Sequence, residues 1–361
     1  MRPPGPGLPE EAYAIALASA PDIGPSTLRD LLASDLPSVA WLRTCAASGA
    51  SPRDVARIWE HHAELGVRVL MAQHPSFPRR LAGDPQAPAL LFCLGEPTVL
   101  GDAPTVALVG TRAPTRYGIG VAAQLGADLS ATGVSVVSGL ALGIDGAAHE
   151  GACGAGAPPI GVVAGGLDDP YPRRHARLWA RVAAEGVIVS ESPAGVRTEK
   201  WRFPVRNRLL AALSDVVVVV ESRHQGGSRD TVDVAMARGI PVGAVPGSIR
   251  SPTSEGTNAL LADGAFPVCS ASDVLVALSL AGTPVAAHVP TRAAGPGHRT
   301  SDREPASGED RRVYQALSHD PAPLDDLARA ARLDLGAMCG ALQRLARAGL
   351  ARDVGGWWQR A

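Results

Sequence analysis

The runs TVALVG (residues 105–110) and VSVVSG (134–139) are short, apolar and β-branched, and an amphipathic stretch separates them. The same alternation continues through four further runs: PIGVVAGG (159–166), GVIVSE (186–191), DVVVVVES (215–222) and PVGAVPG (241–247). Strands that are so uniformly apolar are typical of a sheet covered by helices on both faces. The alternation predicts an α/β fold, an extended Rossmann-like, doubly wound and mostly parallel sheet.

Two different segments flank this core. Residues 8–72 are expected to form short helices, and DIGPSTLRDLL (22–32) resembles a helix-hairpin-helix turn, although a plain Gly-Pro turn is the favoured interpretation. Three helical segments and a hairpin signal near the C-terminus predict a winged helix. We therefore expect four parts: a SAM- or helix-hairpin-helix-like domain at 1–75, a core at 76–281, a Pro/Gly/Ser-rich linker at 282–308 and a winged helix at 309–361.

Composition narrows the class of protein. The 361 residues are 46% hydrophobic and 19% charged, which is enough for packed cores in two or three domains. The net charge of −1 provides no global attraction for polyanions, so nucleic-acid binding would need a local patch. The scattered cysteines and the absence of a membrane-length apolar run predict a reduced, cytoplasmic protein without zinc or membrane insertion.

Candidate site residues follow the strands. In an open parallel sheet, ligands bind beyond the carboxyl ends of the strands, where this chain has small and polar residues. They include Gly110-Thr111-Arg112, Ser138-Gly139 and Gly226-Gly227-Ser228. Loops of this kind at helix N-termini can bind anions through backbone N–H groups.

The segment KWRFPVRNRLLAALS (200–214) adds four cations and two aromatic residues at the start of a predicted helix, and Lys200 is the only lysine of the chain. Positive charge is unfavourable at a helix N-terminus unless an anion lies close by. The anion is neither a dinucleotide nor a nucleoside triphosphate, because both glycine-rich fingerprints are absent. A chain of phosphates remains, held by Lys200, Arg202, Arg206 and Arg208, with Asn207 as a hydrogen-bonding group and Trp201 and Phe203 stacking on bases. An exposed basic face with both aromatic rings in the core is equally compatible with the pattern.

Three other groups of residues were weighed as sites. Asp145 and His149 lie four residues apart and could pair, but a structural hydrogen bond at a helix start is favoured over a catalytic dyad. Asp168, Asp169 and His175 lack the spacing of metal ligands. Arg344, Arg347 and Arg352 fit either DNA binding or protein contact by the winged helix.

The motifs together resemble one family, DNA-processing protein A (DprA/Smf). The matching stretches include FPRRLAGDPQAPALLFCLGE (77–96), VALVGTRAPTRYG (106–118), SGLALGIDGAAHEGA (138–152), GGLDDPYP (165–172), FPVRNRLLAAL (203–213) and VPGSIRSPTSEGTNALLADGA (245–265). The family's usual arginine is Leu142 here, and its S/G-L-I-T-A element reads SRDTV (228–232).

The resemblance implies a homodimeric, non-enzymatic protein without a cofactor that binds single-stranded DNA. Such proteins protect incoming DNA and load the RecA recombinase during natural transformation. The resemblance and the charge pattern together give the candidate DNA-binding residues Gly110, Thr111, Arg112, Ser138, Gly139, Lys200, Phe203, Arg206, Asn207 and Arg208.

Two other functions compete with this one. A nucleotide phosphoribohydrolase has a related fold, but GGSRDTVDVA (226–235) lacks the glycine-threonine step and the glutamate of its signature. A regulator that reads duplex DNA through residues 309–361 is the second alternative.

Overall fold

The computed structural model describes residues 7–45, 49–224, 226–283, 308–318 and 321–360. The chain divides into two compact units, Met1–Val289 and Pro290–Ala361, and each is described by itself. The linker predicted at 282–308 falls almost entirely on residues 284–307, which lie outside the described residues.

The first unit begins with helices that share a core with the sheet. They are α1 (Glu10–Ala18), α2 (Pro25–Ser34), α3 (Pro37–Thr44) and α4 (Pro52–Glu64). The sequence explains where helix α4 begins, because Ser51 and Asp54 form a capping box and Pro52 occupies the first turn. Buried side chains of these helices, including Ile15, Leu17 and Trp41, pack in one cluster with Leu90 and Phe92 of the sheet.

The described residues form a nine-stranded sheet in the order β1-β2-β6-β5-β4-β3-β7-β8-β9. Its strands are β1 (Val67–Met71), β2 (Leu90–Gly95), β3 (Thr105–Val109), β4 (Ser135–Ser138), β5 (Ile160–Val162), β6 (Val187–Ser190), β7 (Val216–Val219), β8 (Val242–Ala244) and β9 (Phe266–Pro267). Only the pairs β1–β2 and β2–β6 are antiparallel in this sheet. The prediction of a mostly parallel, doubly wound sheet is confirmed.

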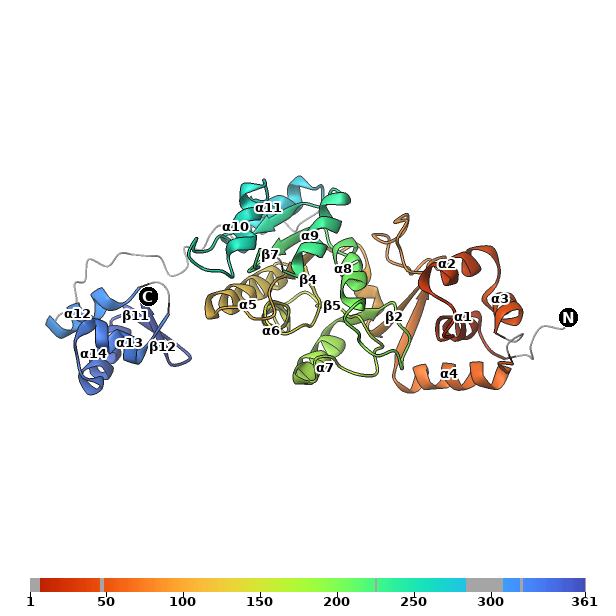
Figure 1. The fold of residues 1–361 in the computed structure, drawn as a ribbon, viewed down its shortest axis with the longest axis horizontal. Coiled ribbons are helices and arrows are strands. Elements are labelled where there is room, and N and C mark those ends of the chain that lie inside the picture. Colours follow the sequence, from red (N-terminus) through yellow and green to blue (C-terminus); the bar gives the residue numbers. More distant parts are fainter. Residues whose placement is uncertain (1–6, 46–48, 225, 284–307, 319–320, 361) are drawn as a thin grey trace. The chain divides into compact units, whose positions relative to one another are not determined.

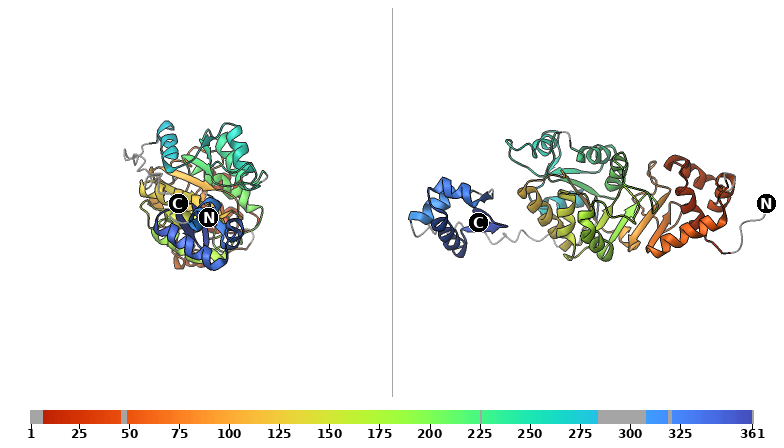
Figure 2. Two further views of the ribbon diagram at one scale, coloured as in Figure 1. Left: turned by 90° about the vertical axis from the view of Figure 1, so that its left-hand side faces the viewer. Right: turned by 60° about the horizontal axis from the view of Figure 1, so that its bottom comes forward.

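Helices cover both faces of the sheet, as the uniform apolarity of the strands predicted. The helices that follow the first strands are α5 (Arg116–Ala131), α6 (Ile144–Ala152), α7 (Ala176–Glu185), α8 (Arg202–Ala212), α9 (Ser228–Ala237), α10 (Glu255–Ala262) and α11 (Ala271–Leu280). Figures 1 and 2 show α5 and α6 on one side of the strands and α8 and α9 on the other. The run DVVVVVES supplies both cores, because Val216 and Val218 pack with α5, α6 and α11, whereas Val217 and Val219 pack with α8 and α9.

One secondary-structure prediction was wrong. Residues 67–71 were expected to belong to a helical segment, but they form β1, the edge strand of the large sheet. Pairing with β2, from Val67 opposite Leu94 to Met71 opposite Leu90, stabilises an extended conformation that the local pattern does not reveal. The boundary predicted at 75/76 stays a prediction, although β1 precedes it and already joins the sheet.

The second unit is a winged helix, as predicted. It comprises α12 (Gly308–Ala316), β10 (Ala322–Pro323), α13 (Leu324–Ala331), α14 (Leu335–Arg347), β11 (Ala351–Val354) and β12 (Trp357–Arg360). The three strands pair in the order β10-β12-β11, and Gly355 and Gly356 close the hairpin with positive φ angles. Leu327, Leu342 and Leu345 lie in its separate core.

Within the described residues, no helix combines the length and apolarity that crossing a membrane requires. The same residues contain no cluster of three or more His, Cys, Asp or Glu side chains arranged to hold a metal ion.

Candidate functional site

The candidate site lies where the strand order reverses. The chain proceeds from β3 through β4 and β5 to β6 on one side, and β7, on the other side of β3, begins the opposite half of the sheet. In doubly wound sheets, ligands bind beyond the carboxyl ends of the strands at this switch point. A cavity of about 530 Å³ occupies the position, and we call it the switch-point cavity.

Seven of the ten predicted residues line the switch-point cavity. They are Gly110, Thr111, Arg112, Lys200, Phe203, Arg206 and Asn207. Tyr171 and Arg223 also line it and were not selected from the sequence, although Tyr171 belongs to the quoted GLDDPYP motif. Gly226, Gly227, Ser228 and Asp230 line it at the N-terminus of α9, and Asp145 is also among its lining residues.

An aromatic and cationic cluster forms one wall of the cavity. The guanidinium carbon of Arg112 lies 4.2 Å from the ring centroid of Phe203, and the ring centroid of Tyr171 is 6.0 Å from that of Phe203. Lys200, just before α8, is exposed. Cationic groups next to ring faces are what recognition of an unpaired nucleotide requires, because phosphates and bases are contacted together.

Arg206 is buried, and it donates hydrogen bonds to other groups of the protein. Its Nη1 donates to the carbonyl oxygen of Gly139 at 2.9 Å and to that of Val162, and its Nε donates to Oδ1 of Asn207 at 3.2 Å. Burial lowers the pKa of Arg206 to about 10, so the side chain remains charged at neutral pH. Arg206 therefore ties α8 to the ends of β4 and β5 and forms the floor of the cavity.

Asp145 and His149 are also buried beneath the site. Burial raises the pKa of Asp145, whose carboxylate accepts backbone hydrogen bonds at Ala141 and Gly139. Burial lowers the pKa of His149 to about 4. Neither ring nitrogen of His149 has a hydrogen-bond partner among the described residues, so the structural hydrogen bond favoured from the sequence does not form between these two side chains.

Three predicted residues do not line the cavity. Arg208 forms an ion pair with Glu191, and the two side chains are only 15% and 14% exposed. The Ser138 hydroxyl donates to the carbonyl oxygen of Leu108 at 2.7 Å, inside the sheet. At Gly139, any Cβ would collide with the Arg206 guanidinium, so this glycine is required for packing.

Other predicted cations also have internal partners. Arg344 of the winged helix donates to Asp310 at 2.7 Å and lies 3.7 Å from Glu309. Arg344, Arg347 and Arg352 are all exposed, and the acidic partners of Arg344 make it less available to DNA than the sequence pattern suggested.

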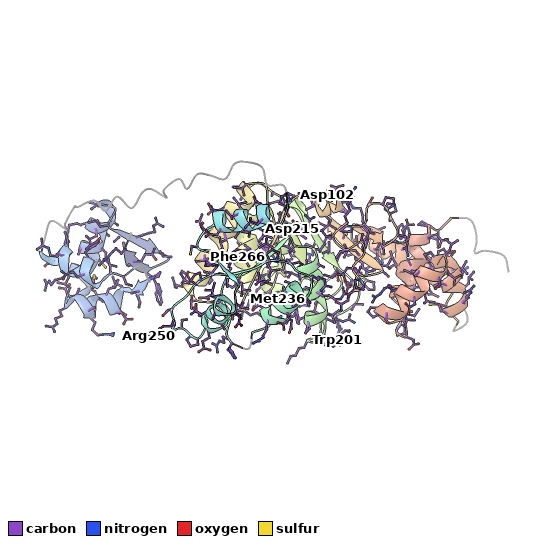
Figure 3. All side chains as sticks on the ribbon, turned by 90° about the horizontal axis from the view of Figure 1, so that it is seen from above. Asp102, Trp201, Asp215, Met236, Arg250 and Phe266 are labelled. Carbon is purple, nitrogen blue, oxygen red and sulfur yellow. The ribbon has the colours of Figure 1, made fainter. Side chains whose placement is uncertain are left out.

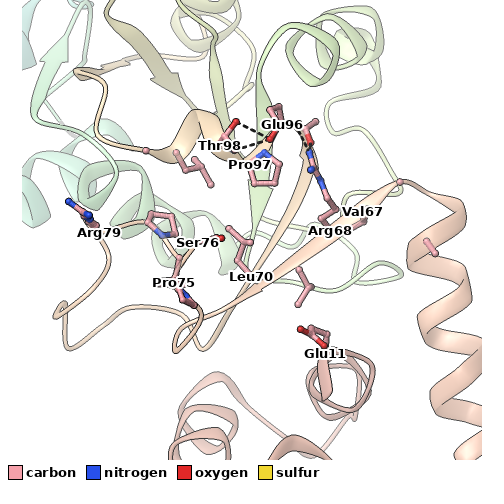
Figure 4. A pocket seen from close by; sticks show the side chains of 18 of the residues that line it. Glu11, Val67, Arg68, Leu70, Pro75, Ser76, Arg79, Glu96, Pro97 and Thr98 are labelled. Atoms are coloured by element: carbon pink, nitrogen blue, oxygen red, sulfur yellow. Dashed lines mark hydrogen bonds and ion pairs between the residues drawn. The ribbon is translucent and has the colours of Figure 1, made fainter. Parts of the chain in front are cut away.

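A larger cavity, of about 1090 Å³, lies beside the edge strand β1 and is not the candidate site (Figure 4). Its cations are paired, because Arg68 lies 3.2 Å from Glu96 and Arg79 lies 3.3 Å from Asp102. None of the predicted site residues lines it.

The fold and the switch-point cavity define a class: a Rossmann-like α/β protein with a C-terminal winged helix and a cationic, aromatic cavity at the switch point. Comparison with family models identifies the particular family. Residues 68–279 match the model described as DNA recombination-mediator protein A, and residues 298–356 match the DprA winged helix domain. The chain belongs to the DprA family.

Relatives and solved structures agree with this assignment. The DNA processing protein DprA of Bacillus subtilis is 36% identical over 218 residues, which cover 60% of this chain and 73% of that protein. The X-ray structure of DprA from Streptococcus pneumoniae matches with a TM-score of 0.62 at 29% identity, covering 74% of this chain and 96% of that chain. A structure of DprA from Helicobacter pylori matches with a TM-score of 0.52 at 31% identity, over 59% and 96% of the two chains, and it is described as giving insight into a unique single-stranded DNA binding mode.

Proposed function

We propose that this protein binds single-stranded DNA in the switch-point cavity. The observation that carries the proposal is that Arg112 and Lys200 line one cavity with the rings of Phe203 and Tyr171, at the carboxyl ends of parallel strands. The cations neutralise phosphates, and the rings stack on bases. The N-terminus of α9, after Gly226 and Gly227, adds backbone N–H groups that face an anion.

A strand fits this cavity better than a free nucleotide. Stacking on aromatic rings works for every base, so we expect slight sequence preference and strong dependence on salt. The single-stranded DNA binding mode described for the H. pylori relative supports the same class of ligand. Arg206 contributes by shaping the cavity floor, and Arg208 by holding α8 to Glu191, rather than by contacting phosphates.

Substitution of Lys200 tests the proposal. Lys200→Ala removes an exposed cation from the cavity, so it should weaken binding of oligothymidylate and reduce the steepness of its salt dependence. Arg53→Ala is the matched control, because it removes an exposed cation from α4. If both variants bind with the same affinity as the unchanged protein, the switch-point cavity is not the DNA-binding site.

The wider role is part of the same proposal. The protein protects incoming single strands and loads the RecA recombinase onto them in the cytoplasm during transformation. Strand-exchange assays test this role, because adding the protein should let RecA act on single strands that are already coated by single-strand-binding protein. An absence of stimulation would limit its function to binding.

Self-association belongs to the proposal as well. Met236 on α9 is 62% exposed and lines a groove with Val232, Ile240 and Leu260 beside the sheet edge formed by β9. We assign this groove, with its exposed Met236 side chain, to a second copy of the chain. Met236→Glu should convert a dimer into a monomer in light-scattering measurements, and a monomeric unchanged protein would refute the assignment.

Catalysis is not part of the proposal. The rival function, phosphoribohydrolase activity, predicts release of free base from nucleoside monophosphates. We expect no turnover, and measurable base release would reinstate the enzyme.

A further inference from the structure

A second groove adjoins the switch-point cavity and shares a wall with it. This groove, which we call the N-terminal groove, has a volume of about 380 Å³. It is lined by residues 18–21, 23–25 and Leu28 from the N-terminal helices, by the segment after β6 and by the first turns of α8. Arg206 lines both the switch-point cavity and the N-terminal groove, so the two lie on either side of this residue near the start of α8.

The surface of the N-terminal groove is mainly apolar and carries an exposed aromatic ring. Ile23, Pro25, Val205 and Leu209 are among its lining residues. Trp201 is 55% exposed, and Figure 3 shows its side chain at the periphery of the ribbon. A large ring left in water beside an apolar groove is typical of a binding surface.

Two contacts hold the Trp201 ring in place. Its Nε1 donates to a carboxylate oxygen of Glu199 at 2.6 Å, and the guanidinium carbon of Arg202 lies 4.2 Å from the ring centroid. A ring fixed in this way loses little conformational freedom when a second flat group stacks on it.

The charges of the N-terminal groove favour a nucleic acid over an apolar peptide. Its ionisable lining residues are Glu191, Arg202 and Arg206. Glu191 is paired with Arg208, and burial raises its pKa, so the carboxylate presents little free negative charge to a ligand. Arg202, whose side chain is 25% exposed and lies 3.9 Å from Glu199, is the cationic group that remains at the surface of the groove, because Arg206 is buried and bonded within the protein.

We propose that the N-terminal groove holds a base of the same single strand that occupies the switch-point cavity, with the base stacked on Trp201. The inference rests on the proposed function and extends it, because it makes the N-terminal helices part of the DNA-binding surface. The Gly-Pro turn at 24–25, singled out in the sequence, then lies beside the strand.

The test uses the full chain and a series of oligothymidylates of increasing length. Trp201→Ala should leave the affinity for the shortest bound oligonucleotide unchanged and weaken binding of longer ones at least about fivefold, the effect of losing one stacked base. Trp201→Phe retains an aromatic face and should restore most of the length dependence. Circular dichroism checks that both variants fold.

A second variant changes the wall of the N-terminal groove that the N-terminal helices form. Pro25→Glu places a carboxylate at the first position of α2, where the helix dipole favours an acid, so we expect folding stability to be kept. Repulsion between this carboxylate and the phosphates of the strand should again selectively weaken the binding of long oligonucleotides.

The outcomes separate the two proposals. If Lys200→Ala weakens binding while Trp201→Ala and Pro25→Glu bind every length as the unchanged protein does, the N-terminal groove is not a DNA site and the switch-point cavity stands. If Trp201→Ala reduces the affinity equally for oligothymidylates of all lengths, the inference is also refuted. If the unchanged protein binds no oligothymidylate, the proposed function itself fails.

Discussion

Arg206 illustrates how the contacts of a cation can differ from those that its place in the sequence suggests. A guanidinium near the start of a helix suggested a phosphate ligand. In the structure the carbonyl oxygens of Gly139 and Val162, at the ends of β4 and β5, receive its hydrogen bonds. Strand ends supply acceptors that only the tertiary fold brings to the helix, so no local pattern could have revealed them.

Replacing Arg206 should therefore damage folding more than binding. Arg206→Ala leaves buried carbonyl oxygens without donors and the buried Asp145 without its neighbouring cation, at a cost of about 2–4 kcal/mol in the free energy of unfolding. Lys200→Ala, at an exposed position, should change the free energy of unfolding by less than about 0.5 kcal/mol. Urea denaturation of both variants measures the difference, and equal stabilities would refute the structural role of Arg206.

His149 makes a prediction about acid stability. Its pKa falls from 6.5 to about 4 on folding, because burial disfavours the charged form. The unfolded chain therefore binds the proton more readily, and the stability contributed by neutral His149 is lost as the pH falls from about 6.5 towards 4. His149→Phe should reduce the loss of unfolding free energy between pH 7 and pH 5 by about 2 kcal/mol. An unchanged pH dependence would contradict the burial of a neutral imidazole.

At the scale of elements, an ion pair joins α8 to the end of β6. Arg208 and Glu191 are both largely buried, so removing either one leaves a charge without its partner. Each single alanine substitution should cost about 3 kcal/mol, and the double substitution should cost at least about 1 kcal/mol less than the sum of the two. Additive effects in this double-mutant cycle would mean that the pair does not form.

The strands show which elements sequence can predict. Each of the six apolar runs quoted from the sequence contains a parallel strand, because burial on both faces leaves a clear pattern. β1 was missed because an edge strand depends on its pairing with β2 and carries little pattern of its own. The winged helix was predicted from its helices and its Gly-Gly hairpin, which are local features.

For the whole molecule, residues selected from separate turns of the sequence line one cavity, but the sequence did not reveal the contacts that each residue makes. Gly110, Arg112, Lys200 and Phe203 were selected from separate turns, and the sheet topology brings them to one cavity. Tyr171 was overlooked, since its position opposite Phe203 depends on how distant loops meet. Lys200 is exposed, whereas Arg208 is largely buried and paired with Glu191. Neither property can be read from a charge pattern.

The central claim is that the switch-point cavity binds single strands through phosphate and base together. The most direct measurement is a salt titration of binding to a single-stranded oligonucleotide and to the matching duplex, for the unchanged protein and for Lys200→Ala. The account predicts tighter binding of the single strand, and a log–log salt slope that is shallower by about 0.7 in the variant, as expected for one lost phosphate contact. Preference for the duplex, or identical slopes for the two proteins, would contradict it.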